Sequence, residues 1–328
     1  MNPFYTSLFH SGELARRTKR LSERLTSCNL CPRHCGVNRL REELGFCSSG
    51  TLPVVSSYCA HHGEEPALSG TRGSGAIFFG NCNLHCVFCQ NYQISHDPAH
   101  QKENECRPEK LAEIMLNLQN QGCHNINLVS PTHFVPQLFQ ALMLAIPRGL
   151  NLPLVYNTNA YDALTTLKEL DTVIDIYLPD LKYASPENAE KYSQAPEYPQ
   201  TARVAIKEMF RQVGDLQTDD SELAERGVIV RHLILPHDLA GTRESLLWLV
   251  REVSPDVTLS LMSQYHPVYL AAQHPELARP ISIAEYETAE QALAEAEIEN
   301  GWVQDMAAQE NYLPDFTRPG HPFEATNS

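Results

Sequence analysis

The sequence has no long apolar run and comparatively little positive charge. No apolar stretch reaches the roughly 18 residues that a membrane-spanning helix needs, so we expect no membrane partner. Lys and Arg number 25 against 40 Asp and Glu, which gives a net charge of −15. This charge would repel nucleic-acid phosphates, so we expect no nucleic-acid partner. The first residues, Glu13 among them, lack the compact apolar core of a signal peptide, and we predict a cytoplasmic protein.

Cysteine, by contrast, is abundant. Ten cysteines in a chain without an export signal suggest a reducing compartment, where thiols bind metals more often than they form disulfides. With 328 residues, 42% of them hydrophobic, the chain is long enough to bury one large core. Seven of the cysteines fall into two spaced sets, which carry most of the functional information.

The more informative set is a C-x3-C-x2-C loop formed by Cys82, Cys86 and Cys89. It offers three thiolates, whereas a closed tetrahedral zinc site or an ordinary all-cysteine cluster needs four ligands. Three thiolates can bind three irons of a [4Fe–4S] cluster and leave the fourth iron open to a substrate or cofactor. The apolar run 75–80 predicts a buried strand that leads into this loop. The alternatives are two zinc ligands with a bystander, or three unrelated buried thiols.

The second set comprises Cys28, Cys31, Cys35 and Cys47, in a region of little hydrophobic periodicity that spans residues 1–70. Four thiolates form a complete ligand set for structural zinc, a rubredoxin-like iron or a second [4Fe–4S] cluster. The alternative is four reduced thiols without a metal. A short, loop-rich region buries too little apolar surface to fold alone, so we expect a metal to stabilise it.

From about residue 75, short apolar runs alternate with amphipathic segments, which is typical of βα units and a parallel sheet. Ser185 and Thr242 are expected to begin helices, and a Ser282-x-x-Glu285 capping box begins the last helix, which Gly301 should end. We therefore predict an α/β fold, a partial (β/α)6 TIM-like barrel with an N-terminal cysteine-rich metal-binding extension. The six predicted strands are 75–80, 126–129, 152–156, 173–178, 228–235 and 257–262.

The chain is accordingly divided into three parts: a cysteine-rich metal-binding head (1–70), the barrel (71–270), and a C-terminal helix and tail packing on the barrel (271–328). In a parallel barrel, ligands bind at the C-terminal ends of the strands, because loops and helix N-termini converge there. Polar residues that occupy or follow the ends of the predicted strands are therefore the candidate site residues: Ser130, Thr132, His133, Asn157, Asn159, Asp180, Lys182 and Arg231.

The cysteine loop, with the aromatic Phe88 directly before its third cysteine, resembles the radical S-adenosylmethionine (SAM) superfamily. The turn 157–159, the Asp-Leu-Lys triplet 180–182 and the Arg-x-Leu-x-x-Pro strand 231–236 resemble, in order, the activating enzymes of pyruvate formate-lyase and other glycyl-radical enzymes. The Cys-Pro-Arg-x-Cys-Gly run 31–36 and the stretch 62–66 are most similar to uncharacterised iron–sulfur homologues of those activating enzymes.

This resemblance implies that a [4Fe–4S] cluster binds SAM at its open iron and cleaves it reductively to methionine and a 5′-deoxyadenosyl radical, which abstracts a hydrogen atom. It implies an electron donor such as flavodoxin or ferredoxin and, if the target is shared, a glycyl-radical enzyme as partner. The alternatives are modification of a small molecule or peptide by the same chemistry or, in a different class, a non-catalytic iron–sulfur electron carrier.

The resemblance also implies SAM contacts, although it names no catalytic side chain. Lys182 would neutralise the SAM carboxylate, and Asp180 would hold a monovalent cation or the SAM ammonium. Arg231 would present its fork to a carboxylate. Phe88 would lie near the adenine. The bland alternative for the Asp180 and Lys182 pair is a surface ion pair that contributes little.

Two strings depart from the family pattern. Where the superfamily commonly has Gly-Gly-Glu, this chain has Ser-Pro-Thr-His, so Ser130 and Thr132 oxygens or backbone carbonyls would receive the SAM ammonium. Asn157 stands where the activating enzymes usually have aspartate, which keeps an oxygen ligand but removes its charge. Asn159 ends the same turn and is included among the expected cofactor contacts.

Overall fold

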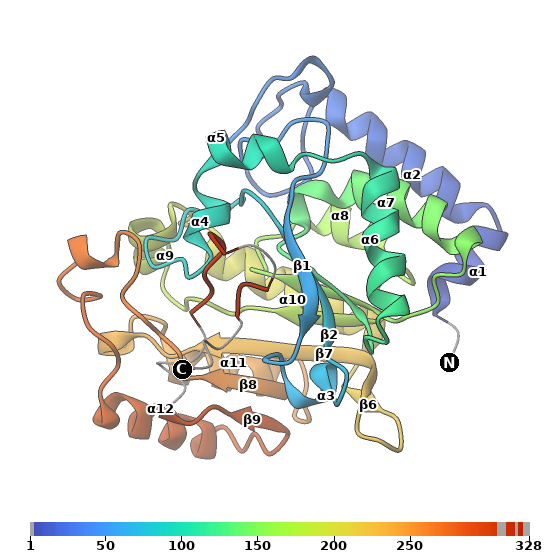
Figure 1. Cartoon of the computed structure of the whole chain (residues 1–328). Helices are drawn as coiled ribbons and strands as arrows, with labels where there is room; N and C mark the ends of the chain where they lie inside the picture. Colours follow the sequence, from blue (N-terminus) through green and yellow to red (C-terminus); the bar gives the residue numbers. More distant parts are fainter. Residues whose placement is uncertain (1–2, 307–312, 319–320, 324–328) are drawn as a thin grey trace.

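The computed structural model describes residues 3–306, 313–318 and 321–323. Its centre is a curved sheet in which successive strands are neighbours, in the order β1-β2-β3-β4-β5-β7-β8-β9 (Figure 1). All neighbours from β2 to β9 are parallel, and β1 pairs antiparallel with β2. The strands are β1 (Val55–His61), β2 (Ser74–Phe79), β3 (Ile126–Val129), β4 (Leu154–Thr158), β5 (Ile176–Pro179), β7 (Ala224–Leu233), β8 (Thr258–Met262) and β9 (Gly301–Val303), with the short β6 (Gln217–Thr218) beside β7.

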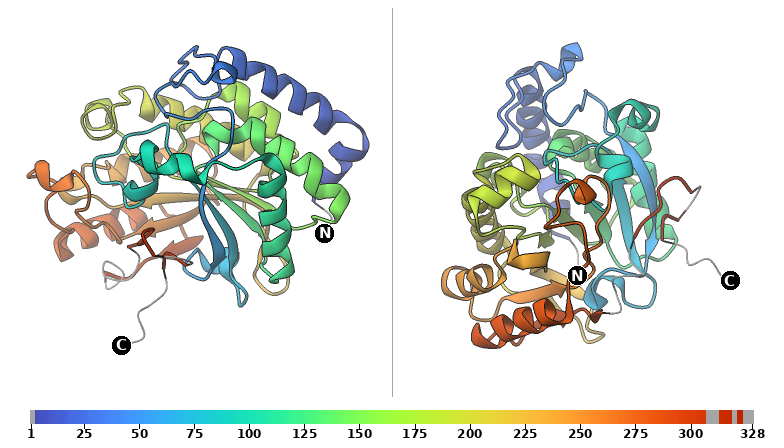
Figure 2. Two further views of the ribbon diagram at one scale, coloured as in Figure 1. Left: turned by 45° about the horizontal axis from the view of Figure 1, so that its top comes forward. Right: turned by 90° about the vertical axis from the view of Figure 1, so that its left-hand side faces the viewer.

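The six strands predicted for the barrel are all present, with ends shifted by a few residues. They are buried along most of their length because helices cover the outer face of the sheet (Figure 2). These helices are α6 (Pro108–Asn120), α7 (Val135–Ala145), α8 (Leu164–Leu170), α9 (Pro186–Ser193), α10 (Tyr198–Val213) and α11 (Thr242–Glu252).

Helix α12 (Ile283–Glu295) begins with the predicted capping box, in which the Ser282 hydroxyl and the Glu285 carboxylate each accept a backbone N–H. Its predicted end at Gly301 is wrong. The helix stops at Glu295, and Gly301 instead begins β9 with a φ of +124°. A Cβ at this glycine would lie 1.9 Å from the Leu259 carbonyl oxygen, so only glycine fits the close approach to β8.

The two other predicted helix starts have different outcomes. Ser185 caps α9 as expected, because its hydroxyl accepts the Asn188 backbone N–H. Thr242 does not cap α11, since the N-cap is Gly241 in a left-handed conformation. The Thr242 hydroxyl lies 3.1 Å from His232 Nε2 instead.

The N-terminal region is more regular than its sequence suggested. Two helices, α1 (Phe4–His10) and α2 (Glu13–Glu23), precede the cysteines, and the apolar side of α2 buries Leu14 and Leu21 next to α7. Strand β1 extends the barrel sheet from within the predicted head. The strand was not predicted because it lies at the edge of the sheet and is mostly partly exposed. Its sequence therefore lacks the continuous apolar run that marks the buried strands.

The inside of the sheet is closed at the N-terminal ends of its strands by α3 (Pro66–Ser69), whose Ala67 and Leu68 pack with Val155, Ile176 and Ile229. The short helices α4 (Tyr92–Ser95) and α5 (Pro98–Gln101) follow the cysteine loop. No helix in the described ranges combines the length and apolarity that crossing a membrane requires. The candidate site lies in the interior of the barrel, at the C-terminal ends of the strands and therefore away from α3.

Candidate active site

A pocket at the C-terminal ends of the parallel strands brings together residues from most of the chain. All three thiols of the C-x3-C-x2-C loop line it. Of the other residues expected to contact a cofactor, those that line it are Phe88, Ser130, Asn157, Asn159, Asp180, Lys182 and Arg231. Residues far apart in the sequence thus converge on one cavity, as the barrel prediction requires.

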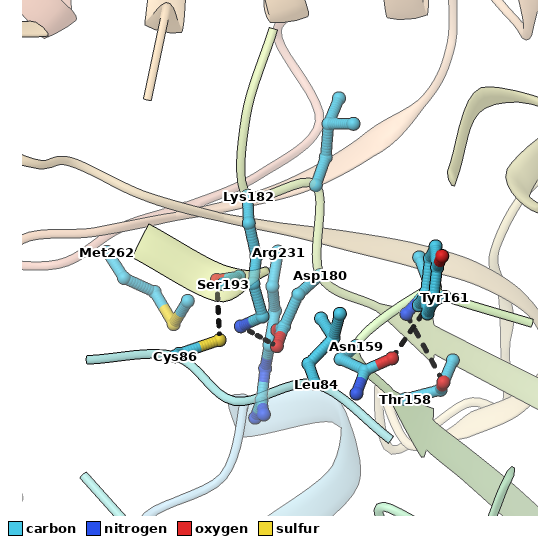
Figure 3. A network of polar contacts seen from close by, with 12 residues as sticks. Leu84, Cys86, Thr158, Asn159, Tyr161, Asp180, Lys182, Ser193, Arg231 and Met262 are labelled. Atoms are coloured by element: carbon cyan, nitrogen blue, oxygen red, sulfur yellow. Dashed lines mark hydrogen bonds and ion pairs between the residues drawn. The ribbon is translucent and has the colours of Figure 1, made fainter. Parts of the chain in front are cut away.

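Each sulfur of the cysteine loop has at least one polar neighbour from the surrounding fold. The Ser193 hydroxyl at the end of α9 donates to Cys86 Sγ at 2.9 Å (Figure 3), and the Ser95 hydroxyl lies 3.2 Å from Cys89 Sγ. Cys82 Sγ accepts the Leu84 backbone N–H at 3.3 Å and the Asn159 amide at 3.5 Å. Hydrogen bonds to sulfur favour the thiolate and tune the potential of a bound cluster.

The thiols are buried, and burial raises the pKa of Cys89 to about 11 and the pKa of Cys82 and Cys86 above the usual range. A metal must therefore displace protons when it binds. Across the described residues, no three or more His, Cys, Asp or Glu side chains are arranged to hold a single metal ion. A four-iron cluster takes each thiolate on a separate iron, so the donor set fits that group without converging on one point.

Asp180 and Lys182 form an ion pair of 2.6 Å whose side chains are 23% and 19% exposed (Figure 3). It is therefore a largely buried pair inside the pocket, and the surface-pair alternative is wrong. Burial lowers the pKa of Lys182, but the negative charges of Asp180 and Cys86 outweigh this effect and leave it raised. Tyr198 fixes the backbone of the triplet, donating to the Asp180 carbonyl at 2.7 Å and accepting the Lys182 N–H at 3.0 Å.

The turn after β4 is fixed by a buried carboxyl. Asp162 accepts hydrogen bonds from Thr132 (2.9 Å), Thr158 (2.6 Å) and Tyr156 (2.9 Å). The expectation that Thr132 contacts SAM is not met, because its hydroxyl turns to Asp162 and the residue does not line the pocket. Ser130 does line it, with a left-handed backbone at φ +59°.

Arg231 differs most from its predicted state. Its Nε and Nη2 donate to the two oxygens of Glu65, both at 2.7 Å, and Nη2 also donates to Glu64. The fork expected to face a carboxylate thus binds two carboxylates of the protein itself, rather than a cofactor. Sequence reasoning missed both glutamates, although two consecutive acids before the proline of α3 were a visible signal.

Two aromatic residues of the predicted site have clear surroundings. Phe88 lines the pocket and makes edge contacts with Tyr183 and Tyr265. Its role beside the adenine of SAM stays a prediction. His133 lies outside the pocket, where its Nε2 is 2.9 Å from the Gly80 carbonyl oxygen. Burial lowers its pKa to about 3, and the residue lines the cavity of the second cysteine set instead.

The second cysteine set surrounds a separate small cavity. Cys28, Cys31, Cys35 and Cys47 all line it, and all four are free thiols. Burial raises the pKa of Cys31 to about 12. The fold thus brings together the four side chains that the sequence singled out, but no single-ion arrangement is found among them. A metal at this cavity stays a prediction.

Comparison with known proteins identifies the family. The model of the radical SAM superfamily matches residues 76–215, which include the cysteine loop. "Uncharacterized protein MJ0674" of Methanocaldococcus jannaschii is 30% identical over 281 residues, covering 83% of this chain and 74% of that protein. "Uncharacterized protein MJ0808" of the same organism is 23% identical over 294 residues, 81% of this chain and 80% of that protein. The cysteine loop, the parallel sheet and the family model agree, and the chain belongs to the radical SAM superfamily.

Proposed function

We propose that this protein is an enzyme that uses SAM to abstract a hydrogen atom from a substrate. The observation that carries the proposal is a single pocket shared by three hydrogen-bonded thiols and the buried Asp180–Lys182 pair. When bound, a [4Fe–4S] cluster supplies one electron that cleaves SAM to methionine and a 5′-deoxyadenosyl radical. Cys82, Cys86 and Cys89 would hold the cluster, which leaves one iron for SAM.

The protein's own residues bind, orient and shield. Lys182 keeps its positive charge in the pocket and can receive the SAM carboxylate. Asn159 donates to Asn83 at 2.8 Å as well as to Cys82, so it ties the turn after β4 to the cysteine loop. Apolar side chains such as Phe88 and Met262 line the same pocket and exclude water, which protects a reactive radical from side reactions.

The hydrogen donor and the partners are finer proposals. The strings that resemble the glycyl-radical activating enzymes, including Asn157, Asp180 and Arg231, line the pocket, and the proposal of a glycine Cα–H as the hydrogen donor rests on that resemblance alone. The partner would then be a glycyl-radical enzyme and the reductant a flavodoxin or ferredoxin. Modification of a small molecule or peptide remains the alternative within the same chemistry. An electron carrier is disfavoured because a three-thiolate site leaves an iron open.

We also propose a second metal centre in the cavity of Cys28, Cys31, Cys35 and Cys47. Its support is the convergence of all four thiols on one cavity. Arg39 lies between this cavity and the barrel, donating to the Gly50 and His133 carbonyls, so the centre would brace the head against β3 and α7. Metal analysis distinguishes the three forms proposed for this centre: structural zinc, a single iron and an iron–sulfur cluster.

Anaerobic reconstitution with iron and sulfide, followed by SAM and dithionite, tests the enzyme. We expect 5′-deoxyadenosine to accumulate with the wild type and to be abolished in Cys86→Ala. Cys59→Ala is the matched control, because Cys59 is a buried thiol of β1 that does not line the pocket. An intact cluster with unchanged SAM would instead identify a carrier. Iron and zinc contents of Cys31→Ala and Cys86→Ala assign the two centres separately.

A further inference from the structure

The loop between β1 and α3 places two carboxylates inside the barrel. Glu64 and Glu65 both bind Arg231 of β7, and their side chains are only 6% and 5% exposed. Arg231 lies directly opposite Ser260 of β8, so the loop reaches across the open sheet from its first edge towards its last strands. Two acids and one guanidinium therefore share one buried position.

The two glutamates are not equivalent. Glu65 takes both of its oxygens to Arg231, at 2.7 Å each, in a bidentate pair that neutralises the guanidinium. Glu64 shares only the Nη2 group and lines the pocket together with the cysteine loop, whereas Glu65 does not. One negative charge at the pocket surface is therefore left without a cation of its own.

The rest of the pocket does not supply that cation. Of the other described charged residues in its lining, Asp180 and Lys182 already neutralise each other at 2.6 Å. Apolar side chains make up much of the rest of the pocket lining, among them Phe78, Val129, Leu233 and Met262.

A second observation points to a ligand at the same place. Asn127 of β3 is completely buried, and neither its amide nitrogen nor its oxygen has a hydrogen-bond partner in the described part of the chain. Although no hydrogen bond of standard geometry joins them, the Asn127 amide lies beside the Glu64 carboxylate and partly offsets the burial that raises the pKa of that carboxyl. Asn127 is two residues before Val129 on the same side of β3 but does not itself line the pocket. A buried carboxylate that only shares a guanidinium, beside an amide with unsatisfied hydrogen-bonding capacity, is costly unless a ligand in the pocket compensates the carboxylate.

We propose that Glu64 is the binding site for an ammonium group of a ligand in the active-site pocket. The inference rests on the proposed function and names the chemistry of what enters beside the cluster: an amine carried on an apolar stem. Two sources have this chemistry, the substrate and the methionine part of SAM. The second is relevant because Thr132, one of the groups expected to receive the SAM ammonium, is turned away to Asp162.

The experiment uses the reconstituted protein and three probes of equal length: n-pentylamine, 1-pentanol and pentanoate. Anaerobic thermal-shift titrations, with and without SAM, give an apparent affinity for each probe. Without SAM, we expect the wild type to bind the amine about tenfold more tightly than the alcohol, the scale of a charge-assisted hydrogen bond, and to reject pentanoate. Glu64→Gln should remove the preference, whereas Glu244→Gln, a change at an exposed surface acid, should keep it.

The arms with SAM distinguish the two sources. A preference that persists when SAM is bound assigns the site to the substrate, and one that disappears assigns it to the SAM ammonium. Equal affinity for amine and alcohol in the wild type, or an unchanged preference in Glu64→Gln, would overturn the inference. If Glu64→Gln does not fold, Glu64→Asp, which keeps the charge on a shorter side chain, should weaken the preference several-fold, and an unchanged preference there would overturn it too. Formation of 5′-deoxyadenosine by the same wild-type samples reports on the proposed function independently.

Discussion

Replacing Arg231 by methionine would remove the cation that Glu64 and Glu65 share. Methionine is unbranched and fills a similar volume, so the change chiefly deletes charge and hydrogen bonds. The three side chains are 16%, 6% and 5% exposed, so water cannot take over the role of the guanidinium. Removing one partner of a buried ion pair costs about 3–5 kcal/mol. At roughly 2 °C per kcal/mol for a chain of this size, we expect Tm to fall by about 6–10 °C at pH 8.

The loss should depend on pH in a defined direction. In the wild type, burial raises the pKa of Glu65, but Arg231 outweighs burial and leaves it lowered, whereas the pKa of Glu64 stays raised because burial dominates. Without Arg231, burial alone acts, and both carboxyls acquire a pKa above their unfolded value. Groups with raised pKa stabilise the fold below the unfolded pKa and lose that contribution as pH rises. The variant should therefore approach the wild type near pH 5 and fall behind it towards pH 8.

Differential scanning calorimetry of the metal-free protein at pH 5 and pH 8 measures both effects. The control is the triple variant with Arg231→Met, Glu64→Gln and Glu65→Gln, in which these three positions carry no charge and most of the lost stability should return. A wild-type Tm for Arg231→Met at pH 8, or an equal loss at both pH values, would refute the view that the triad is held by charge compensation.

Two further changes address the cluster and SAM directly. Ser193→Ala removes the hydroxyl that donates to Cys86 Sγ, so the potential of the bound cluster should become more negative by tens of millivolts, as read by EPR-monitored redox titration; an unchanged potential would mean that this hydrogen bond is not retained with the cluster bound. Lys182→Met removes the buried cation beside Asp180, so the KM for SAM should rise about tenfold or more while cluster content is kept; an unchanged KM would exclude the proposed carboxylate contact.

Much of the barrel was predictable because its signals are local. Buried parallel strands appear as short apolar runs, and the capping box at Ser282 is a pattern of four residues. The cysteine loop is recognised from its spacing together with its immediate neighbours, the strand before it and Phe88. The convergence of Asn157, Asp180 and Lys182 on one pocket then follows from the rule that parallel strands present their C-terminal ends together.

The misses share a different cause, since each depends on a partner that is distant in the sequence. Arg231 lies 166 residues from Glu65, and nothing near either residue indicates the pairing. The Thr132 hydroxyl donates a hydrogen bond to Asp162, a residue that belongs to none of the motifs recognised in the sequence. Gly301 was interpreted as a helix stop because glycine ends helices often, whereas the close approach of β9 to β8 is what requires it here.

The open sheet has a consequence for the shape of the pocket. Strands β1 and β9 end the sheet on its two sides, and the pocket wall near this seam includes Glu64 from the loop after β1 and Phe323 from the C-terminal segment. Neither segment belongs to the repeating βα units that carry the cysteines and Lys182. Changes in these two segments would therefore alter the shape of the pocket without touching the hydrogen-bonded strands or the residues proposed to bind the cluster and the SAM carboxylate.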